Sequence, residues 1–292
     1  MSVVAISDYE FRLLRDLIRD RFGMYYDDTK QFLLQSRLQT RLVKRGLSQF
    51  DAYYRFLTTH ADREEEWDEL ASALSNNETY FFRERAQLDV LASQVLDESL
   101  KQAGRIHIWS SASSTGEEPY SLAMTLLESR RLAPSQINIK ASDISPRALA
   151  RCDEAFYREL SFRATPPDIV QKYFRPFAGG FRINDEVKRL VEFFRLNLLD
   201  ARAVSSVGEM DAIFCRNVLI YFDKPTQKQV VEAFATALRP GGYLFLGHAE
   251  SIMRMTDLYE PVVTPKAIYY RLKPRAAVAR EAQQSVLSRG AQ

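Results

Sequence analysis

The chain has 292 residues, of which 46% are hydrophobic and 27% are charged, and its formal net charge is +2. This length and composition are typical of a soluble protein with room for two domains, and the small net charge excludes a whole-protein nucleic-acid footprint. No apolar run approaches the ~18 residues that span a bilayer, and two cysteines exclude a disulfide framework or a cysteine-rich metal site, so we expect a cytoplasmic protein with no metal and no direct membrane insertion.

The amino-terminal quarter has a helical pattern throughout. Ser7 and Asp8 are helix start signals, Gly23 and Gly46 are stop signals, and no segment alternates with the period of a strand. Residues 1–75 are therefore predicted to form a small helical domain.

One predicted helix of this domain, from Thr29 to Arg45, contains five basic residues and no acidic one. Four of them recur at helical spacing and share a face: Arg37, Arg41, Lys44 and Arg45. A charged face of this kind is commonly only solvated. The alternative is that it attracts an acidic partner and serves in substrate recognition.

Residues 76–103 are predicted to link this domain to the next and to lie over the carboxyl edge of a sheet. The segment begins Asn77-Glu-Thr79-Tyr-Phe-Phe-Arg83. Aromatic faces hold cations and a guanidinium holds anions. We therefore interpret this stretch as an active-site lid.

From residue 104 to 273, apolar strand candidates alternate with helical stretches, which favours a mainly parallel sheet with helices on both faces. The strands are expected at 105–110, 137–141, 193–198, 211–215 and 243–247, with an antiparallel return at 267–273. Between about 156 and 196, prolines and glycines separate short apolar pieces such as 181–183 and 191–194, which predicts a small β insertion. Residues 274–292 are too polar to pack and are predicted to be disordered.

The most informative stretch is Ile106 to Ser121, where a buried strand runs into a turn of small residues and then a helix. In such sheets the cofactor approaches the backbone at this turn. Glu117 and Glu118 open the helix, so a pyrophosphate there would meet carboxylates instead of a bare positive terminus. A cofactor with a cationic centre fits better, and S-adenosylmethionine is the common one. The alternative is a capped helix with no ligand.

Polar residues follow three further strands. Asp143 could accept hydrogen bonds from two ribose hydroxyls or could cap the next helix. Asn197 could recognise an adenine edge or could close a turn. Arg216 and Asn217 are poor core residues, whereas the nearby Tyr221 could pack as a core aromatic.

These motifs together resemble the CheR family of chemoreceptor glutamate O-methyltransferases over roughly residues 5–273. The matching stretches include Asn77-Glu-Thr-Tyr-Phe-Phe-Arg83, Ser113-Ser-Thr-Gly-Glu-Glu-Pro-Tyr-Ser121, Ala141-Ser-Asp143, Asn197-Leu-Leu and Arg216-Asn-Val-Leu-Ile-Tyr-Phe222. The resemblance implies a helical domain, a Rossmann-like methyltransferase domain and an inserted β-subdomain. This is the α/β organisation expected from the residues.

The resemblance also implies roles for individual residues. Arg83 and Tyr221 are expected at the reacting end of the site. The cofactor contacts that it implies are Asn77, Thr79, Arg83, Glu117, Asp143, Asn197, Leu198, Arg216 and Asn217. The insertion around Phe177-Ala-Gly-Gly180 looks short beside relatives that bind a receptor's carboxyl-terminal pentapeptide, so such tethering is not expected.

The implied activity is methyl transfer from S-adenosylmethionine to the γ-carboxylate of glutamates in bacterial chemoreceptors, the methyl-accepting chemotaxis proteins. The products are glutamyl methyl esters and S-adenosylhomocysteine. The implied partner is the cytoplasmic signalling domain of these receptors, and the implied location is at membrane-bound receptor arrays. Two alternatives stay open: a methyltransferase acting on nucleic acid, for which no broad basic surface or Pro-Pro-aromatic site is evident, and a non-catalytic adaptor that binds the cofactor.

Overall fold

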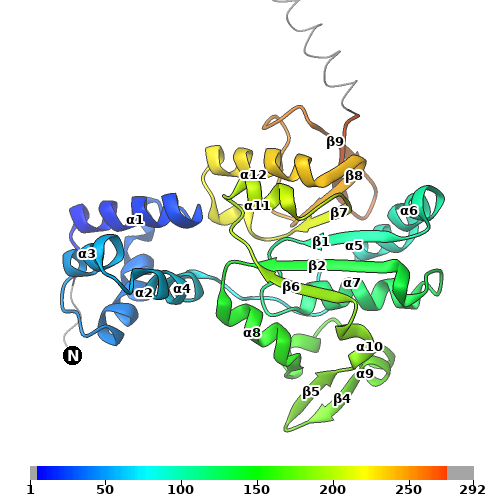
Figure 1. The fold of residues 1–292 in the computed structure, drawn as a ribbon, viewed down its shortest axis with the longest axis horizontal. Helices are drawn as coiled ribbons and strands as arrows, with labels where there is room; N and C mark the ends of the chain where they lie inside the picture. The colour runs from blue at the N-terminus through cyan, green and yellow to red at the C-terminus, as the bar shows by residue number, and fades with distance from the viewer. Residues whose placement is uncertain (1–4, 275–292) are drawn as a thin grey trace, which may run out of the picture.

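The structure, a computed structural model, describes residues 5–274. Four helices form a lobe at one side of a larger α/β body (Figure 1). Apart from Pro274, the tail predicted to be disordered lies outside the described residues.

The helical lobe comprises α1 (Asp8–Phe22), α2 (Gln31–Lys44), α3 (Phe50–Thr59) and α4 (Arg63–Leu74). Ser7 and Glu10 form a capping box at the start of α1, and Gly23 ends that helix with a left-handed φ of 77°. The apolar faces of the four helices bury a common core that includes Leu14, Leu38 and Trp67. The predicted helical domain is therefore confirmed.

The α/β body contains a seven-stranded sheet in the order β6-β2-β1-β7-β8-β10-β9. Its first five strands are parallel, and β10 runs antiparallel to both of its neighbours, as predicted for the last strand. The strands are β1 (Ile106–Ser110), β2 (Ile137–Asp143), β6 (Val191–Arg195), β7 (Met210–Cys215), β8 (Leu238–Leu246), β9 (Tyr259–Val263) and β10 (Ile268–Leu272).

Alternating residues of the central strands enter two different cores. In β7, Ala212 and Phe214 pack toward one face, while Ile213 and Cys215 pack toward the other. The first face is covered by α5 (Arg85–Val90), a π-helical turn (Leu91–Val95), α6 (Leu96–Ala103) and α7 (Glu117–Glu128). The second face is covered by α11 (Ala201–Ser206) and α12 (Lys224–Ala237). Another helix, α8 (Pro146–Glu154), follows β2 and contacts α4 of the helical lobe.

The β insertion is a three-stranded sheet in the order β3-β5-β4. It comprises β3 (Phe156–Tyr157), β4 (Phe174–Phe177) and β5 (Gly180–Ile183), with α9 (Pro167–Tyr173) between the first two and α10 (Asp185–Lys188) after the third. The strand expected in the main sheet at 193–198 is present as β6, which pairs with β2 at the edge of the sheet. It begins at Val191, so the piece at 191–194 belongs to β6 and not to the insertion. Its assignment to the insertion was wrong because a short apolar piece does not reveal which sheet will accept it.

One further expectation needs correction, and one strand was missed. The segment 76–103 is not a lid along its whole length, because residues 85–103 form a nearly continuous helical run packed on the sheet. Strand β9 was not predicted, since Pro261 interrupts its pattern; a proline is tolerated there because β9 is an edge strand.

Candidate functional site

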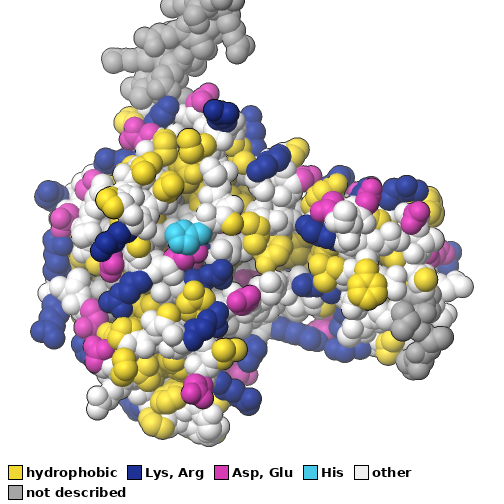
Figure 2. All heavy atoms as spheres, turned by 180° about the vertical axis from the view of Figure 1, so that it is seen from behind, with side chains coloured by type: hydrophobic (Ala, Val, Ile, Leu, Met, Phe, Trp, Pro, Cys, Tyr) yellow, Lys and Arg dark blue, Asp and Glu magenta, His cyan; other side chains and the backbone are white. Residues whose placement is uncertain are grey.

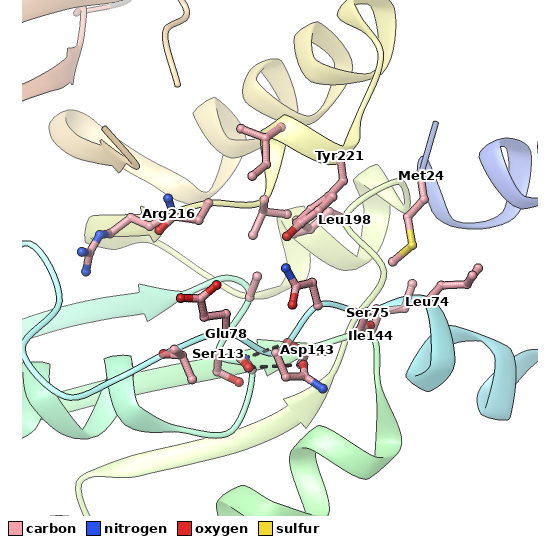
Figure 3. Close-up of a pocket in the computed structure, with 18 of the residues that line it drawn as sticks. Met24, Leu74, Ser75, Glu78, Ser113, Asp143, Ile144, Leu198, Arg216 and Tyr221 are labelled. Carbon is pink, nitrogen blue, oxygen red and sulfur yellow. Dashed lines mark hydrogen bonds between the residues drawn. The ribbon is translucent and has the colours of Figure 1, made fainter. Parts of the chain in front are cut away.

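A cavity of roughly 340 Å³ lies between the helical lobe and the carboxyl ends of the parallel strands. Its walls come from the segments that follow β1, β2, β6 and β7, from residues 74–83, and from the connection between α1 and α2. The chain order of the strands reverses between β1 and β7, and ligands of open α/β sheets bind at this switch point. Figure 3 shows Asp143 and Ser113 on one side of the cavity, with Leu198 and Tyr221 on the other.

Asp143 is the last residue of β2 and is 8% exposed. Its two carboxylate oxygens accept the backbone N–H groups of Ser114 and Ser145, at 2.8 and 2.9 Å. Burial raises the pKa of Asp143 to about 6, although these hydrogen bonds act in the opposite direction. Each carboxylate oxygen accepts only one N–H group, so lone pairs remain for further donors such as vicinal hydroxyls.

The turn after β1 brings backbone close to the cavity. Gly116 has a φ of 99°, and a Cβ at this position would lie 2.8 Å from the Tyr157 hydroxyl oxygen. Only glycine fits this turn without displacing its neighbours. The Ser114 hydroxyl donates to the Asn77 side-chain oxygen at 3.2 Å, so the turn also contacts the segment before α5.

A buried ion cluster forms another wall. Arg216, which is 7% exposed, donates to the Glu118 carboxylate at 3.1 Å and to the Arg83 carbonyl at 2.6 Å, and it lies 3.4 Å from a Glu84 oxygen. Burial raises the pKa of Glu118, with Arg216 opposing that shift. The cluster fixes the Arg83 backbone at the edge of the cavity.

Tyr221 comes from the short 3-10 turn Leu219–Tyr221 after β7, and its ring points into the cavity (Figure 3). Its backbone carbonyl accepts the N–H of Tyr25 at 2.8 Å, and Met24 forms a β-bridge with Phe222. The α1–α2 connection is thus joined to the segment that carries Tyr221.

Asn197 and Leu198 both line the cavity, but the Asn197 amide already has partners. Its nitrogen donates to the Arg21 carbonyl at 2.8 Å, and its oxygen accepts the N–H of Leu199 at 3.1 Å. The side chain therefore closes a turn and ties the helical lobe to the sheet, which was the local alternative to adenine recognition.

The predicted lid is brought to the cavity only in part. Asn77, Glu78, Thr79, Tyr80 and Arg83 line it. Phe81 and Phe82 are instead buried in the core of the sheet, and the face of Tyr80 is covered by Arg163, 3.7 Å from its ring centroid. Of the three aromatic residues of the predicted lid, only Tyr80 reaches the cavity, because Phe81 and Phe82 pack in the core.

Glu117 does not line the cavity, although its neighbour Glu118 does. The Glu117 carboxylate accepts the hydroxyl groups of Thr115 and Ser161 at 2.6 and 3.0 Å. Burial raises the pKa of this group. Of the two glutamates that open α7, only Glu118 forms part of the cavity wall.

The predicted basic face of α2 is not a free surface. Arg41 is 3% exposed and binds the fully buried Glu66 through Nε and Nη2, both at 2.8 Å, and Glu69 through Nη1 at 2.7 Å. Arg45 also pairs with Glu66. The acidic partners lie on α4, so spacing within α2 could not reveal them.

The other two residues of that set have different surroundings. Arg37 donates to the carbonyls of Ala73 and Leu74 at the end of α4, and it lines the cavity. Lys44 is exposed. Neither Arg37 nor Lys44 is paired with a carboxylate of α4, in contrast to Arg41 and Arg45.

Sequence reasoning missed the contribution of the helical lobe to the cavity. Met24, Tyr25 and Tyr26 line it from the α1–α2 connection, and Tyr26 is buried. This connection has no periodic pattern, so only the packing of the two lobes identifies it as part of the site.

Residues 5–274 contain no cluster of three or more His, Cys, Asp or Glu side chains suited to a metal ion. They also contain no helix long and apolar enough to span a membrane. On the face shown in Figure 2, Lys and Arg side chains alternate with Asp and Glu side chains over both lobes. This face therefore has no broad basic surface.

Comparison with known proteins agrees with this architecture. The sequence profile described as "CheR methyltransferase, SAM binding domain" matches residues 77–268, and the profile "CheR methyltransferase, all-alpha domain" matches residues 9–75. A chemotaxis protein methyltransferase of Vibrio parahaemolyticus is 37% identical over 278 residues, which cover 94% of this chain and 100% of the relative. A chemotaxis protein methyltransferase of Escherichia coli K12 is 38% identical over 256 residues, covering 86% and 87%.

Proposed function

Because the chain belongs to the CheR methyltransferase family, we propose that it methylates the γ-carboxylate of glutamates in bacterial chemoreceptors. The methyl donor is S-adenosylmethionine, and the products are a glutamyl methyl ester and S-adenosylhomocysteine. The cytoplasmic signalling domain of the receptor is the partner, and the enzyme acts in the cytoplasm at membrane-bound receptor arrays.

One observation carries the proposal: a single cavity joins the cofactor side of the sheet to residues of the helical lobe. Asp143 lies on the first side, while Met24 and Tyr26 come from the second, and Tyr221 faces the space between them. Methyl transfer requires donor and acceptor in one enclosure. The cavity meets that requirement with contributions from both domains.

The residues fit a cofactor that has hydroxyls and a cationic centre. Asp143 would accept the ribose hydroxyls, and Asn77, Thr79, Leu198 and Asn217 would form the surrounding walls. The Asp143 carboxylate favours positive charge in the cavity, whereas Glu118 is already paired with Arg216. The bound cofactor supplies a methyl group on a positively charged sulfur for transfer to a carboxylate oxygen.

The chain's own residues then need only orient the acceptor. A glutamate has an ordinary pKa of about 4.3, so it is already anionic near neutral pH and needs no general base. The Tyr221 hydroxyl would position the carboxylate, and the Arg83 guanidinium would hold either this acceptor or the carboxylate of the cofactor. A weak, oriented contact suits the acceptor, because a tight ion pair would stabilise its ground state.

We assign receptor recognition to the helical domain, residues 1–75, through Arg37 and the exposed Lys44. Residues 76–83 complete the active-site cover, and 84–273 form the methyltransferase domain with its insertion. The carboxylates of Glu66 and Glu69 neutralise Arg41, so we do not assign this arginine to the receptor contact.

A labelling experiment tests the proposal against its two alternatives. The full chain would be incubated with S-adenosylmethionine that carries a tritiated methyl group, together with receptor-containing membranes or with DNA and RNA. We expect label on the receptor that mild alkali releases as methanol, since carboxylate esters are base-labile. Label on nucleic acid would support the first alternative, and cofactor binding without transfer would support an adaptor.

A further inference from the structure

We propose that Glu250 is a positioning residue that holds the Arg216–Tyr221 segment in its reactive conformation. The inference rests on the proposed function, which places this segment at the site of methyl transfer. Glu250 follows β8 and is not among the residues that line the cavity, so it acts through the segment rather than on a ligand.

The Glu250 carboxylate accepts four backbone N–H groups. Oε2 accepts Gly247 at 2.6 Å and Asn217 at 2.8 Å, while Oε1 accepts Val218 at 2.8 Å and Ile220 at 3.3 Å. Three of these donors belong to the turn after β7, where the sheet ladder has ended. One side chain therefore takes the place of the missing ladder bonds.

The turn held in this way is conformationally demanding and carries residues of the cavity. Asn217 has a φ of 59°, a left-handed conformation that few side chains adopt. On either side of the Glu250 contacts lie Arg216, which holds Glu118 and the Arg83 carbonyl, and Tyr221. A shift of the turn would move all of these groups together.

Gly247 shows how closely the two strand-end segments approach. A Cβ at Gly247 would lie 2.6 Å from Asn217 Nδ2, 2.9 Å from Asn217 N and 2.9 Å from Glu250 Oε2. The β8 end therefore needs a glycine for the carboxylate to reach the β7 turn. Gly247 and Glu250, which do not line the cavity, thus fix the geometry of the turn at 216–221, which does.

The sharpest variant is Glu250→Gln, which keeps the shape but replaces one acceptor oxygen by an NH2 donor. Two of the four N–H groups would then face another donor. We expect amide hydrogen exchange in residues 215–221 of the cofactor-free protein to accelerate by about tenfold or more, with exchange in β1 unchanged. Turnover of receptor methylation should fall by a similar factor, with the variant still folded by circular dichroism.

Two further variants complete the design. Gly247→Ala should reproduce faster exchange in 215–221 with Glu250 intact, and Glu260→Gln, which alters an exposed carboxylate on β9, should change neither readout. Normal exchange and turnover in Glu250→Gln would overturn the inference. Global unfolding of this variant would also overturn it, because the inference limits the role of Glu250 to the segment at 216–221. If the unmodified chain transfers no methyl group, the proposed function fails instead, whereas the exchange result still decides whether Glu250 holds the segment.

Discussion

At the scale of single residues, Asp143 is buried and also lines the cavity. Its carboxylate accepts two backbone N–H groups and still carries a pKa of about 6, above the ordinary 3.8, because burial disfavours the charge. Between about pH 4 and 6, Asp143 is therefore protonated to a greater extent in the folded, cofactor-free protein than in the unfolded chain. This group makes stability fall as the pH rises through that window.

Cofactor binding should show the opposite trend. Ribose hydroxyls favour the ionised carboxylate, so we expect the affinity for S-adenosylhomocysteine to rise from about pH 5 to a plateau above about pH 6.5. Calorimetric titrations at several pH values would measure this. Asp143→Asn should remove this rise and weaken binding at neutral pH by about 1–3 kcal/mol; a variant with unchanged affinity would remove Asp143 from the ribose role.

Tyr221→Phe tests the reacting end of the cavity. We expect affinity for S-adenosylhomocysteine to stay within about twofold and receptor methylation to fall by about tenfold or more, since one oriented hydrogen bond is lost. Binding and initial rates would be measured on the same preparation. Full activity would show that the ring only packs and that its hydroxyl has no role.

At the scale of elements, the contact between α2 and α4 is an ion network rather than a docking face. Burial opposes ionisation of Glu66, but hydrogen bonds from Arg41, Arg45 and Tyr53 outweigh it and hold the pKa of this carboxyl below its ordinary value. Its stabilising contribution is therefore present above the unfolded pKa and is lost as the pH falls. Arg41 therefore stabilises the helical domain.

Replacing Arg41 should therefore lower the stability of the helical domain, rather than act directly on receptor binding. Arg41→Glu would remove two of the hydrogen bonds that hold the buried Glu66 and would add a like charge beside Glu66 and Glu69, and we expect a loss of about 3–5 kcal/mol in the free energy of unfolding. Denaturant titration would measure it, with Lys44→Glu on the exposed side as a control expected within about 0.5 kcal/mol. A stable Arg41→Glu variant would contradict the network's importance.

The β4–β5 hairpin leads to a prediction about tethering. Its turn has only Ala178 and Gly179, both with positive φ, and the edge strand β4 carries Pro176, which has no N–H to offer an added strand. We expect a receptor and the same receptor without its carboxyl-terminal pentapeptide to be methylated at equal rates. A marked loss with the truncated receptor would show that the hairpin binds the tether.

At the scale of the whole molecule, the parts predicted well from sequence are those with a local signal. Short apolar stretches between helical segments located β1, β2, β6, β7, β8 and β10, and a capping serine located the first helix. The failures depend on distant partners: the aromatic pair Phe81 and Phe82 entered the sheet core, and the acidic residues that neutralise α2 lie on another helix. The same limit hid Met24 and Tyr26, whose place in the cavity depends on how the two lobes pack.

The two lobes are joined at several points around the cavity. Arg147 of α8 pairs with Glu69 of α4, Arg195 pairs with Asp68, and Tyr25 donates to the Tyr221 carbonyl. The helical domain is thus held against the segment that carries the reacting end. If the helical domain recognises the receptor, as proposed, this arrangement brings the receptor beside the cavity.

The central claim is that this shared cavity transfers a methyl group to a receptor glutamate. Tandem mass spectrometry of receptor cytoplasmic domains incubated with the full chain and S-adenosylmethionine tests it most directly, with Tyr221→Phe as the matched control. The account predicts a mass increase of one CH2 on the side chains of particular glutamates, strongly reduced with the variant. Unmodified glutamates, or a methyl group found only on another residue type, would contradict it.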